Sequence, residues 1–341
     1  MRIFFKKTLI LLSRIGISLI LLLFLFRNID KETLFGLIKS ADRKLLFISG
    51  SIFFITHILG FFRWEMLLRA AHIRLPLKRI LMSFAGGIFF NLFLPSTIGG
   101  DLVRSIDLAS HTKKTKEVVA TVFLDRLSGY IALVFFAVIS VSLGWDLVQD
   151  KVKNILINVA ILVVMLVLVL LVLFNNRVYT KINKFLQPRK ILKTQGFKPV
   201  FFDKLRESLK NLHQEIHVFR KNKKVIVINL VMSFMIQIVA AVSFYFIGVS
   251  LGLRISIIYY CIFLPLIGAI TFLPISIGGL GLRDQTTVHL FAKAGVSNNM
   301  AFAMSLLNFS FVLICGSLGG IIYVLTIHHR RIQRHQPSPV S

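Results

Sequence analysis

The phrase FLPSTIGGDLVR (residues 93–104) returns as FLPISIGGLGLR at residues 272–283, which is 179 positions further along the chain. Seven of the twelve positions are identical, among them a Pro, two adjacent glycines and an Arg four residues past the second glycine. Apolar segments that break at corresponding places in two halves are the best sequence indication of the binding site in transporters built from internal repeats. The doubled phrase therefore predicts two related halves, each with a break near a binding site.

The composition is that of a membrane protein. The 341 residues are 56% hydrophobic and include 32 Phe, and several apolar runs approach the ~20 residues that a helix needs to cross a bilayer. The net charge of +27 must then lie in the loops, where the positive-inside rule explains it better than binding to nucleic acid does. The two cysteines, Cys261 and Cys315, lie in apolar segments and fit neither a disulfide framework nor a metal site.

The apolar runs predict an all-α polytopic fold, with residues 1–341 forming a single integral membrane domain. The first run follows MRIFFKK, and no small-residue cleavage site comes after it, so we expect a retained signal anchor. The clear spans are residues 10–26, 45–62, 118–143, 155–174, 225–251 and 300–327.

Residues 80–110 are predicted to enter and leave the membrane on the same face. Basic residues stand on both sides of this segment, in the loop 63–79 and again at 113–116, and both groups belong on the cytoplasmic side. The helical part before Pro95 is only fifteen residues long, about 22 Å, against a hydrocarbon core of about 30 Å. A re-entrant hairpin that breaks at Pro95 satisfies both observations.

Residues 255–294 are predicted to form a second hairpin, which enters from the outer face. The loop 175–224 has fourteen Lys/Arg against three Asp/Glu, so this loop and the basic tail 330–341 belong in the cytoplasm. Arg283 and Asp284 in the returning arm argue against a plain crossing, because a charge at the bilayer centre costs at least about 2.5–3.5 kcal/mol.

Hairpins that enter from opposite faces indicate inverted-topology repeats. We therefore expect a first half over residues 1–174, which holds the hairpin 80–110, and a second half over 225–329, which holds the hairpin 255–294. The protein then has six main spans, or eight membrane segments if each hairpin is counted as one. Both termini are expected on the cytoplasmic side of the cytoplasmic (inner) membrane.

Each break has the residues of an anion site. The Pro ends the incoming half-helix, and the outgoing half-helix begins with free N–H groups and the positive end of its dipole, about one turn before an Arg. In the alternative interpretation, Pro and Gly only kink packed helices, the small hydroxyl residues cap them and the Asp favours the dipole. The candidate substrate-binding residues are Arg104, Arg283, Gly99, Gly100, Gly278, Gly279, Thr97, Ser276 and Asp101.

Two adjacent charges lie inside the span 118–143, where they are costly unless they are paired. Asp125 and Arg126 have three sets of candidate partners, which are Arg104, Asp107, or each other together with the membrane interface. We regard Asp125, Arg126 and Asp107 as candidates for an ion pair or for a proton coupled to transport.

The phrases RWEMLLR (63–69) and FLDRLSGY (123–130), taken with the doubled phrase, resemble the membrane domain of the lysylphosphatidylglycerol synthase/flippase-like family. That domain is the N-terminal, lipid-translocating half of the multiple peptide resistance factor. The resemblance implies movement of a lipid between leaflets. A C-terminal transferase domain makes the lipid in bifunctional relatives. We expect this chain to lack that domain, because only about ten residues follow the last span.

The leading functional hypothesis is flippase-like, ATP-independent translocation of an anionic phospholipid or of a lipid linked to polyprenyl phosphate, since the chain has no phosphate-binding loop motif. One alternative is a non-catalytic membrane partner of a separate lipid synthase or glycosyltransferase, and a less favoured one is an enzyme that acts on lipid phosphates. We expect a protein that is not an enzyme, with no cofactor, no metal and no nucleic acid among its ligands. Anionic membrane lipids are the expected partners.

Overall fold

The computed structural model describes residues 30–94, 99–112, 114–148, 159–168, 222–271 and 279–334, with the single positions 27, 157 and 180. Side chains near the C-terminus are described up to residue 325. The predicted span 10–26, nearly all of the basic loop 175–224 and the candidate residues Thr97, Ser276 and Gly278 lie outside these ranges.

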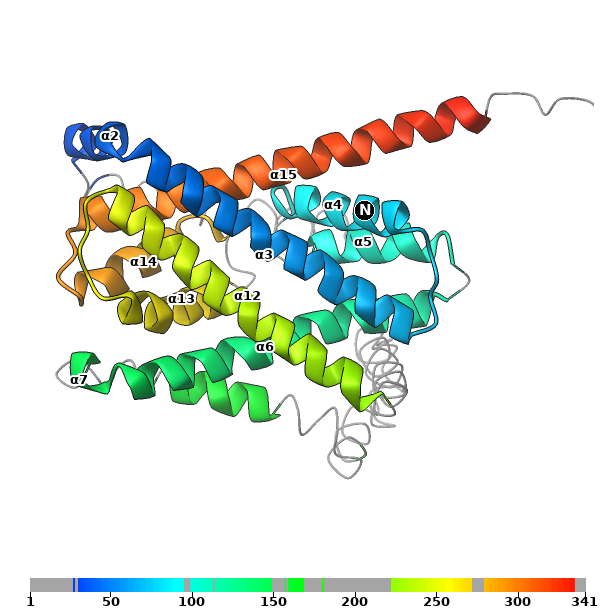
Figure 1. Cartoon of the computed structure of the whole chain (residues 1–341), viewed down its shortest axis with the longest axis horizontal. Coiled ribbons are helices and arrows are strands. Elements are labelled where there is room, and N and C mark those ends of the chain that lie inside the picture. Colours follow the sequence, from blue (N-terminus) through cyan, green and yellow to red (C-terminus); the bar gives the residue numbers. More distant parts are fainter. Residues whose placement is uncertain are drawn as a thin grey trace, which may run out of the picture.

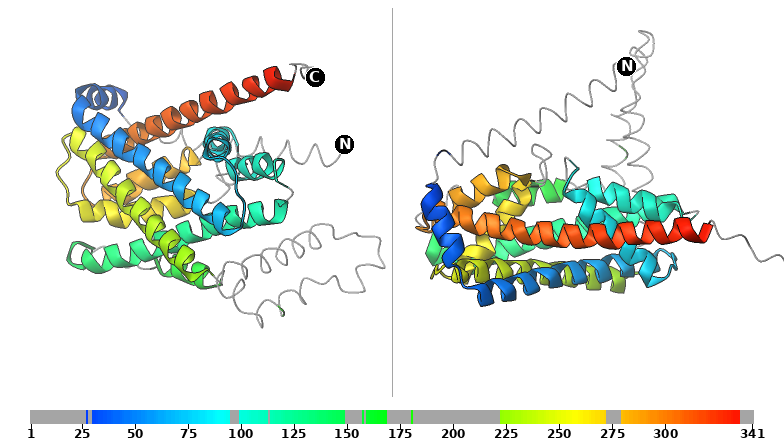
Figure 2. Two further views of the ribbon diagram at one scale, coloured as in Figure 1. Left: turned by 45° about the vertical axis from the view of Figure 1, so that its right-hand side comes forward. Right: turned by 90° about the horizontal axis from the view of Figure 1, so that it is seen from above.

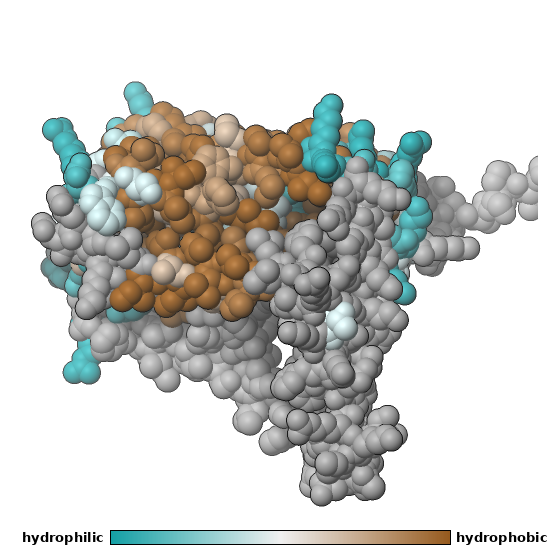
Figure 3. Space-filling view, turned by 90° about the horizontal axis from the view of Figure 1, so that it is seen from below, coloured by the Kyte–Doolittle hydropathy of each residue, from teal (hydrophilic) through white to brown (hydrophobic). Residues whose placement is uncertain are grey.

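The described regular elements are all helices, which confirms the predicted all-α fold. Four of them are long and apolar enough to cross a membrane, and they extend from Arg43, Thr115, Lys223 and Asn298. Figure 3 shows one face of the molecule, on which a continuous apolar surface is bordered at both ends by hydrophilic residues. Many large apolar side chains, such as Phe47 and Leu143, are exposed on the surface of the bundle, as expected of residues that face lipid. The protein is therefore a multi-pass membrane protein.

The two halves have the same series of helices. Each has a long helix, then a short and a shorter helix, then a second long helix, and the first three members match in length at 28, 15 and 11 residues. The first half consists of α3 (Arg43–Ala70), α4 (Leu77–Asn91), α5 (Gly99–Ala109) and α6 (Thr115–Leu143), and the second half consists of α12 (Lys223–Ser250), α13 (Ile257–Thr271), α14 (Leu282–Ala292) and α15 (Asn298–Arg334). Two small helices, α2 (Lys31–Ser40) and α7 (Trp145–Val148), lie outside the repeat.

The halves are inverted relative to each other. Helices α3 and α12 pack side by side and run in opposite directions (Figure 1). Helices α6 and α15 also run in opposite directions. The hairpin α4–α5 lies at the end of the bundle where the chain turns at residues 71–76, and the hairpin α13–α14 lies at the end with residues 251–256 (Figures 1 and 2). This arrangement agrees with the inverted repeats and the opposed hairpins that the charge pattern predicts.

Each hairpin packs against the last long helix of the other half. Helix α4 packs on α15, and α13 packs on α6. A side chain at Gly319 would bring its Cβ within 2.6 Å of the Ala85 carbonyl oxygen, so the first of these contacts depends on backbones that approach closely. Because each hairpin packs on a long helix of the other half, the two halves form one bundle.

The C-terminal end of α3 differs from the prediction. The loop 63–79 was expected to begin at Arg63, but α3 continues to Ala70. Arg63 therefore lies inside a membrane-crossing helix and not in a cytoplasmic loop. The physical reason is that the residues after it include Trp64, Leu67 and Leu68, which are buried and extend the apolar contact of the helix by two turns.

Candidate functional site

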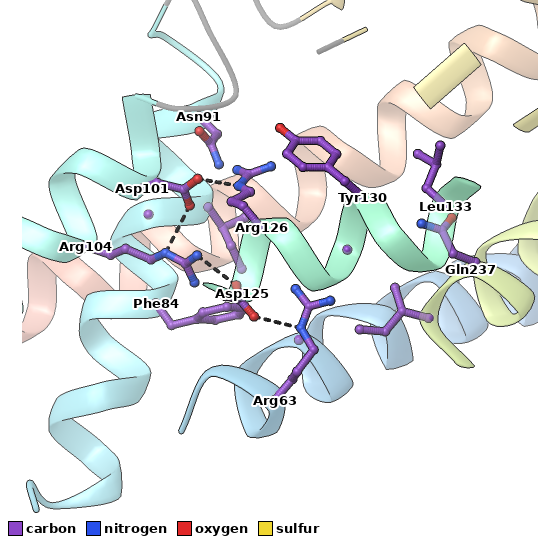
Figure 4. A pocket seen from close by; sticks show the side chains of 15 residues that line it. Arg63, Phe84, Asn91, Asp101, Arg104, Asp125, Arg126, Tyr130, Leu133 and Gln237 are labelled. Atoms are coloured by element: carbon purple, nitrogen blue, oxygen red, sulfur yellow. Dashed lines mark hydrogen bonds and ion pairs between the residues drawn. The ribbon is translucent and has the colours of Figure 1, made fainter. Parts of the chain in front are cut away.

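Five helices surround a cavity of about 250 Å³ in the first half of the protein (Figure 4). Helices α4 and α5 bring the hairpin, α6 brings the adjacent Asp and Arg, and α3 and α12 close the opposite wall. Three glycines and eight polar or charged side chains share the lining with four apolar residues. The lining residues are Gly60, Arg63, Phe84, Gly87, Ile88, Asn91, Asp101, Arg104, Asp125, Arg126, Gly129, Tyr130, Leu133, Ile236 and Gln237.

The second glycine of the doubled phrase sets the position of α5. A Cβ at Gly100 would overlap the carbonyl oxygen of Gly87, so only glycine lets α5 lie this close to α4. The Gly100 N–H donates to Asn91 Oδ1 at 2.9 Å, which satisfies one amide of the first turn of α5. From α5, Asp101 and Arg104 extend to the α6 side chains with which they pair (Figure 4).

Five charged side chains form one alternating chain through the cavity wall. Arg63 Nε lies 2.7 Å from Asp125 Oδ1, and Arg104 Nη2 lies 2.9 Å from Asp125 Oδ2. Arg104 Nε is also 3.0 Å from Asp101 Oδ1, an ion pair that falls outside hydrogen-bond geometry, and Asp101 Oδ2 accepts a hydrogen bond from Arg126 Nε. The order of contacts is therefore Arg63, Asp125, Arg104, Asp101, Arg126, as the dashed lines of Figure 4 show.

The charge chain has three guanidinium groups and two carboxylates, so its formal charge is +1. Neutral groups support the cations without cancelling this charge. The Arg104 guanidinium lies 4.6 Å from the centre of the Trp64 ring, and Arg63 Nη1 donates to Ser233 Oγ on α12 at 2.8 Å. Removing ions from water is costly unless they are paired, so an excess cation among these largely buried side chains favours an anion as ligand.

The structure brings together four of the residues that the sequence singled out. The cavity is lined by Asp101, Arg104, Asp125 and Arg126. Of the candidate partners that the sequence offered for Asp125, the structure shows Arg104. Asp107 is at the other end of α5, where its carboxylate pairs with Arg79 at 3.1 Å. It does not pair with Asp125 or Arg126 in the contacts described.

The second copy of the phrase does not reproduce this site. Arg283 Nη2 pairs with Asp284 Oδ1 of its own helix at 2.7 Å, and its guanidinium lies 4.9 Å from the centre of the Phe309 ring. Asp284 Oδ2 accepts the Gly281 N–H at 2.9 Å, directly before the start of α14. The first-turn amide and the Arg that were expected to face a ligand therefore face a carboxylate of the protein. Gly279, with φ of 76°, has a backbone conformation that glycine favours.

Sequence reasoning missed Arg63 as a member of the site. An intramembrane Asp that needs a cation was visible at position 125, and an Arg at the edge of a predicted span was visible at 63. The two are 62 residues apart, and nothing local in the sequence joins them. The apolar residues that follow Arg63 were the available signal, because they extend the helix beyond it.

A second cavity, of about 430 Å³, lies beside the other hairpin. Its walls come from α13, α14 and the helical residues 159–168, and in the described part of the chain its lining contains no Asp, Glu, Lys or Arg. The polar groups that reach it are Gln285, Thr286 and His289. The two hairpins therefore border cavities of different chemistry, one charged and one mainly apolar.

A family model described as the lysylphosphatidylglycerol synthase TM region matches residues 11–320, so the chain belongs to this family. The chain is 25% identical over 320 residues to a UPF0104 membrane protein from Pyrococcus horikoshii. The alignment covers 89% of this chain and 92% of the relative. Two UPF0104 membrane proteins from Methanothermobacter thermautotrophicus are 27% and 25% identical to it. Each alignment covers 78% of this chain, and 80% and 78% of the respective relatives.

Proposed function

Because the chain belongs to a family of membrane proteins named for a lipid synthase, we propose that it binds the anionic headgroup of a membrane lipid in the charged cavity and moves that lipid between the leaflets without ATP. The observation that carries the proposal is the excess of one guanidinium over the carboxylates around this cavity. A phosphate group accepts charge-assisted hydrogen bonds from guanidinium groups and would neutralise the excess. The ligand is an anionic phospholipid or a lipid linked to polyprenyl phosphate.

The size of the cavity supports a headgroup as the bound part. A volume of about 250 Å³ lies below the ~300–1,000 Å³ that pockets for whole small-molecule ligands occupy. The acyl or isoprenoid chains would stay in the bilayer and lie along the exposed apolar surface of the bundle. The protein then needs to shield only the charged part of the lipid from the hydrocarbon core.

The inverted halves supply a route to both leaflets. Repeats of this kind transport by rocking or gating one half against the other around a fixed site. In the proposed orientation the 71–76 end faces the cytoplasm, where the basic residues of the flanking loops belong. The hairpin α4–α5 then opens toward the inner leaflet and α13–α14 toward the outer one.

The test is leaflet exchange in liposomes that contain the purified protein, with fluorescent phosphatidylglycerol and a fluorescent polyprenyl phosphate as lipids. We compare the wild type with Arg126→Gln, which removes the most exposed cation of the charge chain, and with Arg69→Gln as control. Arg69 pairs with Glu65 outside the cavity, and its side chain is 65% exposed. The proposal expects exchange by the wild type and the control, and a loss of at least about tenfold in Arg126→Gln, as one charge-assisted contact is worth. A wild type that exchanges neither lipid contradicts it.

A further inference from the structure

We propose that Asp101 is a built-in counter-ion that the phosphate of the lipid displaces. Before the lipid binds, this carboxylate pairs with both Arg104 and Arg126, and on binding the lipid phosphate takes its place beside these two guanidinium groups. The inference rests on the proposed function and adds to it how the site releases what it binds. Asp101 is, in this view, the residue that sets the affinity of the cavity for its ligand.

The position of Asp101 suits displacement better than that of Asp125. Asp125 lies between Arg63 and Arg104, and the side chains of Asp125 and Arg104 are each only 5% exposed. Asp101 lies between Arg104 and Arg126. Its own side chain is 10% exposed, and that of Arg126 is 25% exposed. A ligand that enters the cavity therefore reaches the pair Asp101–Arg126 with the least loss of buried contacts.

In the second half of the protein the equivalent Arg also pairs with a carboxylate, but that carboxylate is buried. There the carboxylate of Asp284 accepts from the Gly281 N–H, the Arg283 guanidinium and the Ser305 hydroxyl. Arg283 and Arg104 occupy the same place in the two copies of the phrase, and a carboxylate of the same helix pairs with each. The Asp284 side chain is almost completely buried at 1% exposure, whereas Asp101 borders a cavity. Only the first of these carboxylates is placed where a ligand can replace it.

The displacement has a mechanical consequence. Asp101 on α5 holds Arg126 on α6, so its release removes one of the two ion pairs that link the hairpin to the long helix. The pair Arg104–Asp125 remains as the second link. Without an internal counter-ion, three guanidinium groups and one carboxylate would hold an anion so strongly that it would leave slowly, and a transport site must bind weakly enough to release.

Binding can be followed through a natural reporter. The chain has two Trp residues, and Trp64 lies against the Arg104 guanidinium. Trp145→Phe therefore leaves Trp64 as the sole tryptophan, which can be excited selectively at the long-wavelength edge of Trp absorption. In this background we titrate the full chain in neutral mixed micelles with phosphatidylglycerol. For Asp101→Asn we expect half-saturation at about tenfold lower lipid, because a charged competitor has been removed, together with slower exchange in liposomes. Asp101→Glu, which restores the carboxylate, should bring the affinity back toward the wild-type value.

A matched control lies on the same helix. Asp107→Asn removes a carboxylate of α5 that pairs with Arg79 outside the cavity, and it should leave the half-saturation point unchanged. Titration with inorganic phosphate and with glycerol phosphate shows whether the free anion also displaces Asp101 or only the anchored lipid does. An Asp101→Asn protein that binds phosphatidylglycerol with equal or weaker affinity than the wild type overturns the inference. A wild type that neither binds nor exchanges any of the lipids overturns the proposed function instead.

Discussion

At the scale of single residues, Asp125 is the centre of the charge chain. Its two oxygens hold Arg63 from α3 and Arg104 from α5, and it is itself buried on α6. Three helices that are distant in the sequence are therefore joined at one carboxylate. This carboxylate stabilises the fold because its removal would leave two buried guanidinium groups without the counter-ion that they share.

The first prediction concerns the loss of this carboxylate. Asp125→Asn should lower the free energy of unfolding by about 3–5 kcal/mol, because removing one partner leaves buried cations unpaired. Lys39→Gln, at an exposed position of α2, should change it by less than about 1 kcal/mol. Thermal unfolding of both variants in the same detergent measures the difference. Equal melting temperatures for the two variants would contradict the proposed role of Asp125.

The second prediction compares two glycines. Gly100 lets α5 approach α4, whereas Gly129 borders the cavity. Gly100→Ala should destabilise the protein by about 1–3 kcal/mol, because its Cβ overlaps the Gly87 carbonyl. At Gly129 a Cβ meets only Arg63 Nη1, at 3.7 Å, so Gly129→Ala should be tolerated. Gly129→Leu should fill the cavity and suppress lipid exchange while the protein stays folded. Normal exchange by a folded Gly129→Leu protein would show that the lipid does not pass through this cavity.

At the scale of elements, the exchange of hairpins between the halves determines how the bundle holds together. Helix α4 belongs to the first half and packs on α15 of the second, with Gly316, Gly319 and Gly320 at the contact. The side chains of Leu92 and Phe89 meet Gly316 and Gly320, and the backbone of Ala85 meets Gly319. In lipid, where apolar side chains gain little from leaving the solvent, such close backbone approach is a main source of helix association.

The third prediction tests this contact. Gly319→Leu should separate α4 from α15 and lower the melting temperature, because even a Cβ at this position comes within 2.6 Å of the Ala85 carbonyl oxygen. The control is Gly36→Ala in α2, where no heavy atom lies within 4 Å of the added Cβ and a higher helix propensity favours the variant by up to about 1 kcal/mol. A melting temperature that falls in neither variant would mean that this packing contributes little.

At the scale of the whole molecule, the two hairpins lie at opposite ends of the bundle and the ends carry different loops. The fourth prediction is that thiol reagents that do not cross the membrane react with cysteines placed at these two ends from opposite sides of the membrane. In a background of Cys261→Ser and Cys315→Ser, Lys114→Cys should react from the cytoplasmic side only and Arg254→Cys from the outer side only. Reaction of both from one side would refute the inverted arrangement in the membrane.

Much of the fold could be predicted from the sequence because its signals are local. Apolar length identified the long helices 115–143, 223–250 and 298–334 to within a few residues, except at the end of the last one, and the charges of the flanking loops predicted two hairpins of opposite sense. The predicted end of the helix before Arg63 was wrong. In the sequence, a charge at the end of an apolar run gives the same pattern whether its side chain faces water or a buried Asp. That distinction depends on a partner 62 residues away.

Apolar length, loop charges and the doubled phrase are enough to predict an all-α membrane protein with two inverted halves, in which Arg104 and Arg283 have equivalent places. The difference between these two places becomes visible only when the helices are packed together. Arg104 meets Asp125 and Trp64 at the wall of a cavity, whereas Arg283 meets its neighbour Asp284 and Phe309. The physical reason is that the electrostatic state of a buried charge is set by the groups within a few ångströms of it. In the first half those groups come from other helices, whose approach no local repeat can specify.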